Sequence, residues 1–323
     1  GTETKEYLSK VLNRITVLGA IFLVFIALLP YVLPMVTSLP SSVSMGGTGI
    51  IIVVGVALDT VKQLEAQMLI ACFTSIAVDY YTSSVLLSVL AGVLSGAVVG
   101  AVVAVLQVKY KAADMVVGTA LNLLVGAITT FLLYLLFGLR GKLVDNRLMS
   151  LTKINLPLIR DIPFIGRVLE NLTIIDYLSY IIAVILFVYL YKTVAGFRTL
   201  SVGINKAAAE SLGTKATRIQ MEMVILSGAL CGLGGVVLSM GQVTMFTENM
   251  TSGRGFIAMA AASLGMSHPL LVIAASLFFG LCQGIGLAIQ NVVKSQLTNT
   301  LPYIATIVAL VIFSKRSGTK LKG

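Results

Sequence analysis

Residues 84–108 read SVLLSVLAGVLSGAVVGAVVAVLQV, a run of 25 residues without one charged side chain. A helix of about 20 apolar residues matches the hydrocarbon core of a bilayer. The run has no period-two alternation, so it indicates a helix and not a strand of a barrel. Similar runs recur along the chain, and only 11% of the residues are charged, against roughly 25% in a soluble domain. The sequence therefore predicts an all-α, polytopic transmembrane helix bundle with no soluble domain.

These apolar runs predict about ten membrane segments. They lie at 15–36, 47–60, 66–79, 84–108, 114–139, 177–195, 217–241, 255–267, 270–290 and 300–314. Two of them, 66–79 and 255–267, are short for a crossing and are interpreted as half-helices or re-entrant segments. Small residues at four-residue spacing predict close helix packing. They are Gly92/Gly96/Gly100, Gly228/Gly232 and Gly280/Gly284.

The basic residues lie mainly in the breaks between apolar runs, which is typical of cytoplasmic loops. This distribution explains the net charge of +10 without a nucleic-acid partner. It also predicts that both termini are cytoplasmic. The exception is the segment 140–176, which carries six basic and four acidic residues on the expected outer side.

The sequence has few residues that could catalyse a reaction, bind a metal or bind a nucleotide. His268 is the only histidine, and the chain has neither a GxxxxGK[ST] loop nor a GxGxxG fingerprint after a strand. The sequence therefore predicts no catalytic site, no metal site and no ATP hydrolysis by this chain. Carboxylates near the ends of the predicted segments are expected to snorkel or to face water. They are Asp59, Glu65, Asp79, Asp114 and Glu222.

The most informative polar segment is 191–219, YKTVAGFRTLSVGINKAAAESLGTKATRI. Asn205 is placed to cap a short helix through KAAAESL, and Gly213 is placed to end it. So short a helix needs another surface to order it. Spacing alone leaves two readings open, docking onto another protein and an ordinary amphipathic loop on the membrane.

This segment resembles the motif R-x-x-G-E-N-P-x-A-A-x-x-x-G-I of bacterial ABC importer permeases for simple sugars and nucleosides. The chain departs from it at Ile204, Lys206 and Thr214, where the family has Glu, Pro and Ile. The resemblance implies a cytoplasmic coupling helix at about 203–214 that the ATPase subunit receives. The residues it implies for coupling are Arg198, Gly203, Asn205, Ala208, Ala209, Glu210 and Gly213.

Further stretches resemble the same family in the same order, at 114–124, 158–166, 251–270 and 301–317. The resemblance implies a permease subunit for nucleosides or simple sugars that works by alternating access. It implies a separate ABC ATPase that uses ATP, a second permease (a homologue or another copy), and an extracytoplasmic substrate-binding lipoprotein. No cofactor is expected on this chain, and the expected location is the bacterial plasma membrane. Polar residues expected near mid-bundle, as candidates for lining the path, are Asn122, Ser227, Gln283 and Asn291.

The N-terminal segment resembles a different family. TKEYLSKVLNRITVLGAIFLVFIALLPYVL and MGGTGIIIVVGVALDTVKQLEAQML are similar to the last two spans of SecY, the pore subunit of the Sec translocase. We therefore expect a SecY-like two-span segment at 1–68 and a permease domain at 69–323. This arrangement indicates a chimera, whether a fused gene, a misassembled sequence or an artificial joining. The alternative function is a fragment of the Sec protein translocase.

Overall fold

The computed structural model describes residues 6–7, 9–17, 19–21, 24, 47–145, 147–154, 172–251 and 253–289. The chain divides into two compact units, Gly1–Asp59 and Thr60–Gly323. Described residues between 6 and 24 are helical. Most of the predicted segment 15–36, the whole of 300–314, and Asn291 lie outside the described residues.

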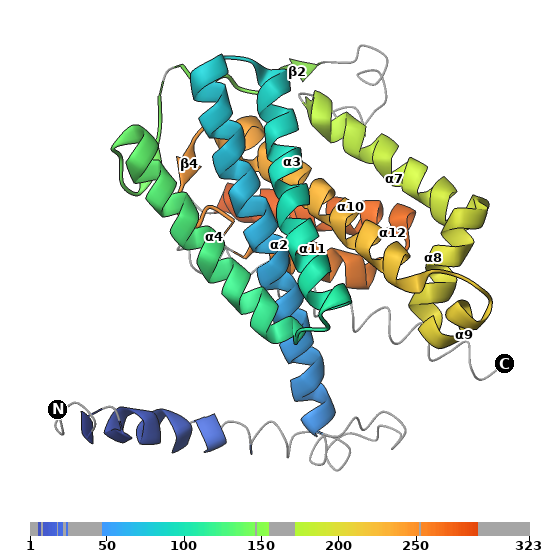
Figure 1. Cartoon of the computed structure of the whole chain (residues 1–323). Coiled ribbons are helices and arrows are strands. Elements are labelled where there is room, and N and C mark those ends of the chain that lie inside the picture. The colour runs from blue at the N-terminus through green and yellow to red at the C-terminus, as the bar shows by residue number, and fades with distance from the viewer. Residues whose placement is uncertain are drawn as a thin grey trace. The chain divides into compact units, whose positions relative to one another are not determined.

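The described part of the chain beyond residue 46 is mostly helical (Figure 1). Its helices are α2 (Gly47–Thr82), α3 (Val85–Ala104), α4 (Asp114–Phe137), α7 (Ile174–Lys192), α8 (Val194–Ile204), α9 (Lys206–Ser211), α10 (Ala216–Val236), α11 (Arg254–Leu264) and α12 (Pro269–Ile289). Two π-helices continue α3 and α10, η2 (Val105–Lys109) and η3 (Val237–Val243). Four two-residue strands pair as β1 (Lys142–Leu143) with β4 (Phe246–Thr247) and β2 (Lys153–Ile154) with β3 (Leu172–Thr173).

Among the described residues, six helices are long and apolar enough to cross a membrane. They confirm the helices predicted at 84–108, 114–139, 177–195, 217–241 and 270–290. The prediction of separate segments at 47–60 and 66–79 is wrong, because α2 runs through both. The polar residues between them contain no Gly or Pro to stop a helix. The count of about ten segments is therefore not confirmed.

Glu65, a charged side chain of α2, contacts the start of α11. The Glu65 carboxylate accepts a hydrogen bond from the backbone N–H of Gly253 (3.0 Å), directly before α11. A Cβ on Gly255 would lie 2.7 Å from Glu65 Cγ, so α11 begins against α2. With 11 residues, α11 is far shorter than the roughly 20 residues of a crossing.

Helices α3 and α10 pack closely, and glycines form their contact. A Cβ on Gly96 would lie 2.5 Å from Gly228 O and 2.7 Å from Gly232 Cα. A Cβ on Gly100 would lie 3.0 Å from Gly228 Cα. The predicted close packing is thus confirmed for these glycines, which let the two backbones touch. At Gly280 and Gly284 of α12 a Cβ would meet nothing within 4 Å, so the same prediction is not supported there.

Residues 139–154, here called the strap, follow α4 and are tied to the bundle at several points. Leu151 N–H donates to Met240 O of η3 (3.1 Å). Met149 N–H donates to the Asp79 carboxylate of α2 (2.7 Å). β1 of the strap pairs with β4. In Figure 1, β2 and the turn from α2 to α3 lie at one end of the helices, while α8 and α9 lie at the other.

Asp79 does not snorkel as expected, because its side chain is fully buried. We expect Asp79→Ala to release the strap, since the part-buried N–H of Met149 would lose its hydrogen-bond partner, at a cost of about 1 kcal/mol. Protease cleavage or deuterium exchange within 140–150 should rise in the purified protein, while Asp79→Asn, which keeps one acceptor, should rise less. Equal protection in wild type and Asp79→Ala would contradict this role.

Candidate coupling site

The polar segment after α7 folds into two short helices joined by a sharp corner. α7 ends at Lys192. The next residue, Thr193, has an extended backbone, and its hydroxyl accepts a hydrogen bond from Gly196 N–H (3.1 Å) at the start of α8. Gly196 is buried against the end of α7, where a Cβ would lie 2.6 Å from Leu190 Cα. The α8 helix was not predicted. We call α8, α9 and their connections, residues 193–215, the elbow.

Asn205 forms the corner of the elbow. Its extended backbone ends α8 and precedes α9, and its Oδ1 accepts from Ala208 N–H (3.1 Å). This confirms the predicted N-cap. Gly213 follows α9 with a φ of +80°, a conformation that favours glycine, and so confirms the predicted stop. The helix is shorter than the expected 203–214, because Gly203 belongs to α8.

The inner face of the elbow is fixed to the foot of α10. Val202, Ala209 and Ala216 are buried together, with Ile219 packed against them. Lys206 Nζ also donates to Gln220 Oε1 (3.1 Å). These contacts join α9 to the start of α10.

The outer face of the elbow carries apolar side chains that no other described residue of the chain covers. Ile204 is 87% exposed and Leu212 is 85% exposed, at opposite ends of α9. Arg198, Ala208 and Glu210 are also exposed, whereas Ala209 points inward. Sequence reasoning missed both apolar residues, since Ile204 was noted only as a departure from the motif. The sequence pattern that could have identified them is a bulky apolar residue on each side of a short, capped, polar helix.

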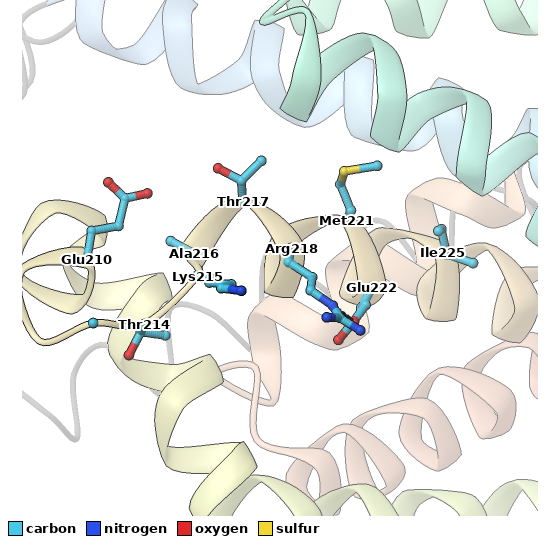
Figure 2. Close-up of a pocket in the computed structure, with 10 residues that line it drawn as sticks. Glu210, Thr214, Lys215, Ala216, Thr217, Arg218, Met221, Glu222 and Ile225 are labelled. Atoms are coloured by element: carbon cyan, nitrogen blue, oxygen red, sulfur yellow. Dashed lines mark hydrogen bonds and ion pairs between the residues drawn. The ribbon is translucent and has the colours of Figure 1, made fainter.

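An open cavity of about 770 Å³ lies beside the exposed end of α9. Among the residues that line it, Figure 2 shows Thr217 and Met221 on one side of α10 and Arg218 and Glu222 on the opposite side. Arg218 and Glu222 form an ion pair (2.8 Å) one turn apart on α10. A second cavity of about 520 Å³ is lined by residues of η2, the start of α4, Lys206 and α10. The end of the bundle around the elbow is thus hollowed.

The candidate path residues lie on three different helices. Asn122 is half-buried on α4, and Ser227 and Gln283 are exposed on α10 and α12. None of the hydrogen bonds in the described part of the chain joins one of them to another. Their role stays a prediction. His268 stacks on Tyr191 of α7, with ring centroids 5.1 Å apart, so it packs α12 against α7.

Across the described ranges, no group of three or more His, Cys, Asp or Glu side chains is placed to hold a metal ion. Six long apolar helices, with the capped and exposed elbow at one end, define a helical membrane protein. Residues 49–313 match the family described as "Branched-chain amino acid transport system / permease component". The chain belongs to this family of transporter permeases, whose members are not themselves enzymes.

Two relatives match most of the chain. The nucleoside ABC transporter permease protein NupC of Lactococcus lactis is 30% identical over 262 residues, which cover 77% of this chain and 82% of NupC. The guanosine ABC transporter permease protein NupQ of Bacillus subtilis is 30% identical over 266 residues, covering 79% of this chain and 83% of NupQ. No solved structure matches the chain.

The N-terminal region matches a second family. Residues 1–61 match SecY. The protein translocase subunit SecY of Staphylococcus carnosus is 50% identical over 68 residues, which cover 21% of this chain and 16% of that protein. The expected resemblance of the N-terminal segment to SecY is therefore confirmed.

Proposed function

We propose that the chain is the permease subunit of an ATP-driven importer for nucleosides or simple sugars. In this proposal a separate ABC ATPase docks on the elbow, and this chain binds no cofactor. A second permease, either a homologue or another copy, completes the pathway, and an extracytoplasmic lipoprotein delivers the solute. The chain lies in a bacterial plasma membrane with both termini and the elbow in the cytoplasm.

The observation that carries the proposal is the two-faced elbow. Its inner face is buried on α10 through Ala209 and Lys206, while Ile204 and Leu212 project outward. Exposed bulky apolar side chains on an otherwise polar surface favour protein contact. The names of the two relatives supply the solute class, and they favour nucleosides.

The packing supports a route by which the ATPase moves the pathway. The elbow is fixed to α10, and the backbones of α10 and α3 touch at Gly96, Gly228 and Gly232. At the far end of α10, η3 holds the strap through Met240. Closure of the ATPase pair would thus move α3 and α10 as one body and shift the strap, as alternating access requires.

The proposed division of the chain is a SecY-like segment at 1–68 and a permease domain at 69–323. The family matches overlap only at 49–61, which supports a join in this region. Sequencing the native locus across codons 55–80 tests the chimera. One intact transcript would indicate a natural fusion, and two separate genes would show an artificial join.

The alternative function is a fragment of the Sec translocase. The match of residues 1–61 to SecY favours this alternative for the N-terminal region. The aligned stretch covers only 16% of the SecY of Staphylococcus carnosus. Co-purification separates the two candidates. An associated ABC ATPase favours the importer, and associated SecE or ribosomes favour the Sec fragment.

We expect Asn205→Ala combined with Gly213→Val to uncouple transport while membrane insertion persists. The first change removes a helix cap, which is worth about 1 kcal/mol, and the second strains a backbone at positive φ. ATP-driven uptake by the reconstituted complex should fall severalfold at equal permease content. The control is Asn205→Asp with Gly213→Asn, because Asp keeps the cap and Asn tolerates the backbone. Wild-type uptake by the first pair would contradict the coupling assignment.

Substrate class is tested in the same proteoliposomes by competition with unlabelled nucleosides and sugars. The proposal expects labelled nucleoside uptake to be competed by other nucleosides. Competition by sugars alone would assign the transporter to the sugar branch.

A further inference from the structure

One arginine lies at the depth of the membrane-crossing helices and not at their ends. Arg254 begins α11, and the residue before it, Gly253, donates its backbone N–H to the Glu65 carboxylate (3.0 Å). The Arg254 guanidinium is also close enough to Cys72 for an electrostatic interaction. Glu65 and Cys72 both lie in the middle third of the candidate span Gly55–Thr82. Cys72 is about 15 Å of helix from the end of that span, so the arginine is too deep to snorkel to it.

The guanidinium is held by an amide and is partly open. Arg254 Nη1 donates to Gln242 Oε1 of η3 (2.8 Å). Gln242 is exposed, and Arg254 is half-buried. A charged side chain at this depth is costly in lipid, and such residues almost always face the interior of a bundle or a water-filled cavity. The pair of Arg254 and Gln242 therefore indicates a surface of the transport path and not a surface for lipid.

Both side chains are carried by backbone that packs against α2. Gly255 lies so close to α2 that a Cβ on it would be 2.7 Å from Glu65 Cγ, which fixes the start of α11. The hydroxyls of Ser239 and Ser75 are hydrogen-bonded (3.0 Å), which joins η3 to the same helix. Two fixed elements thus position the pair, as precise recognition of a solute requires.

The groups that this pair offers to a solute are hydrogen-bond donors. An arginine side chain has five N–H donors and no acceptor. Among the described residues, the Gln242 oxygen accepts from one of these donors, and the Gln242 NH₂ group is a further donor. Two guanidinium N–H groups match two adjacent acceptors, as they do with O6 and N7 of guanine. Adenine carries an NH₂ donor where guanine carries O6, so it fits the same donors less well.

We propose that Arg254 contacts the solute in the transport path and favours nucleosides whose base presents two adjacent acceptors, as 6-oxopurines do. This rests on the proposed function, which supplies a nucleoside as the solute. Arg254 is the residue that touches the solute. Gln242 is a positioning residue, because its oxygen holds the guanidinium in place.

The test measures ATP-driven uptake by proteoliposomes that contain the complete transporter. Guanosine is compared with 7-deazaguanosine, which keeps O6 and lacks the N7 acceptor, as the ratio of their kcat/KM values. The binding protein is the same in every sample, so its own preference cancels when the ratios of two permeases are compared. Arg254→Gln should lower the guanosine advantage about tenfold. Arg254→Lys keeps the charge but loses the paired donors, so it should lower the advantage as well.

Two further variants complete the test. Arg140→Gln in the strap is the matched control and should keep the wild-type ratio. Gln242→Ala changes an exposed residue of the same site, so it serves even if Arg254→Gln does not fold. It should lower the ratio about threefold, because the guanidinium loses the hydrogen bond that holds it.

A guanosine advantage that is the same in wild type, in Gln242→Ala and in each Arg254 variant that folds would overturn the inference. So would separation of the two permeases on substitution of Arg254 with an unchanged ratio, since the arginine would then belong to their interface. A wild-type transporter without ATP-driven uptake of any nucleoside refutes the proposed function. Uptake with an unchanged ratio refutes only this inference.

Discussion

Replacing Ile204 and Leu212 together with Glu is expected to release the ATPase from the membrane complex. Both side chains are more than four-fifths exposed in this chain, so they contribute little to its own folding. In the complex they would be the apolar anchors of a polar surface, and losing such an anchor weakens binding by about 2 kcal/mol or more, roughly 30-fold. A buried carboxylate without a partner adds to this cost.

The measurement is the dissociation constant between the detergent-solubilised permease and its purified ATPase. Val144→Glu is the matched control, since Val144 is also exposed but lies in the strap. It should bind the ATPase as wild type does. The thermal stability of the free permease should be the same in all three proteins. Wild-type affinity of the double variant would exclude the elbow as the docking surface.

Gly96→Leu is expected to have the largest effect on stability. Even the Cβ would lie 2.5 Å from the carbonyl oxygen of Gly228, and its neighbours are backbone atoms, which cannot rotate away. Insertion of a side chain there would separate α3 from α10, at a cost of about 3 kcal/mol or more. It would also break the proposed route from elbow to strap.

Thermal unfolding in detergent, followed by size-exclusion chromatography, measures this effect. Gly126→Leu on α4 is the control, because a Cβ there meets nothing within 4 Å. It should unfold near the wild-type temperature. Equal unfolding temperatures for Gly96→Leu and Gly126→Leu would show that the glycine contact is not needed.

Hydropathy predicted the long helices because burial in lipid depends on composition, and α3, α4 and α12 begin within a residue of their predicted starts. Between residues 60 and 66 hydropathy wrongly predicted a break in the helix, because the charged residues there resemble those of a loop. The Glu65 carboxylate of α2 is hydrogen-bonded to Gly253, a distant partner that periodicity cannot locate. Asp79 misled for the same reason, since its partner Met149 comes from a segment far along the chain.

Local chemistry made part of the site predictable. Asn205 and Gly213 act on neighbouring backbone, so their cap and stop were predicted from sequence alone. The α8 helix was missed because its start depends on the Thr193 cap and on close contact of Gly196 with α7. The exposure of Ile204 and Leu212 depends on which face of the elbow packs on α10, and only the folded chain reveals that face.

The most direct test of the central claim is nucleoside uptake by proteoliposomes that contain this chain, its partner permease, the ATPase and the binding protein. The account predicts accumulation of labelled nucleoside above the external concentration, only with ATP, and its loss in the Ile204→Glu, Leu212→Glu variant. Uptake that is the same without ATP, or the same in that variant, would contradict an ATPase-driven permease coupled through the elbow.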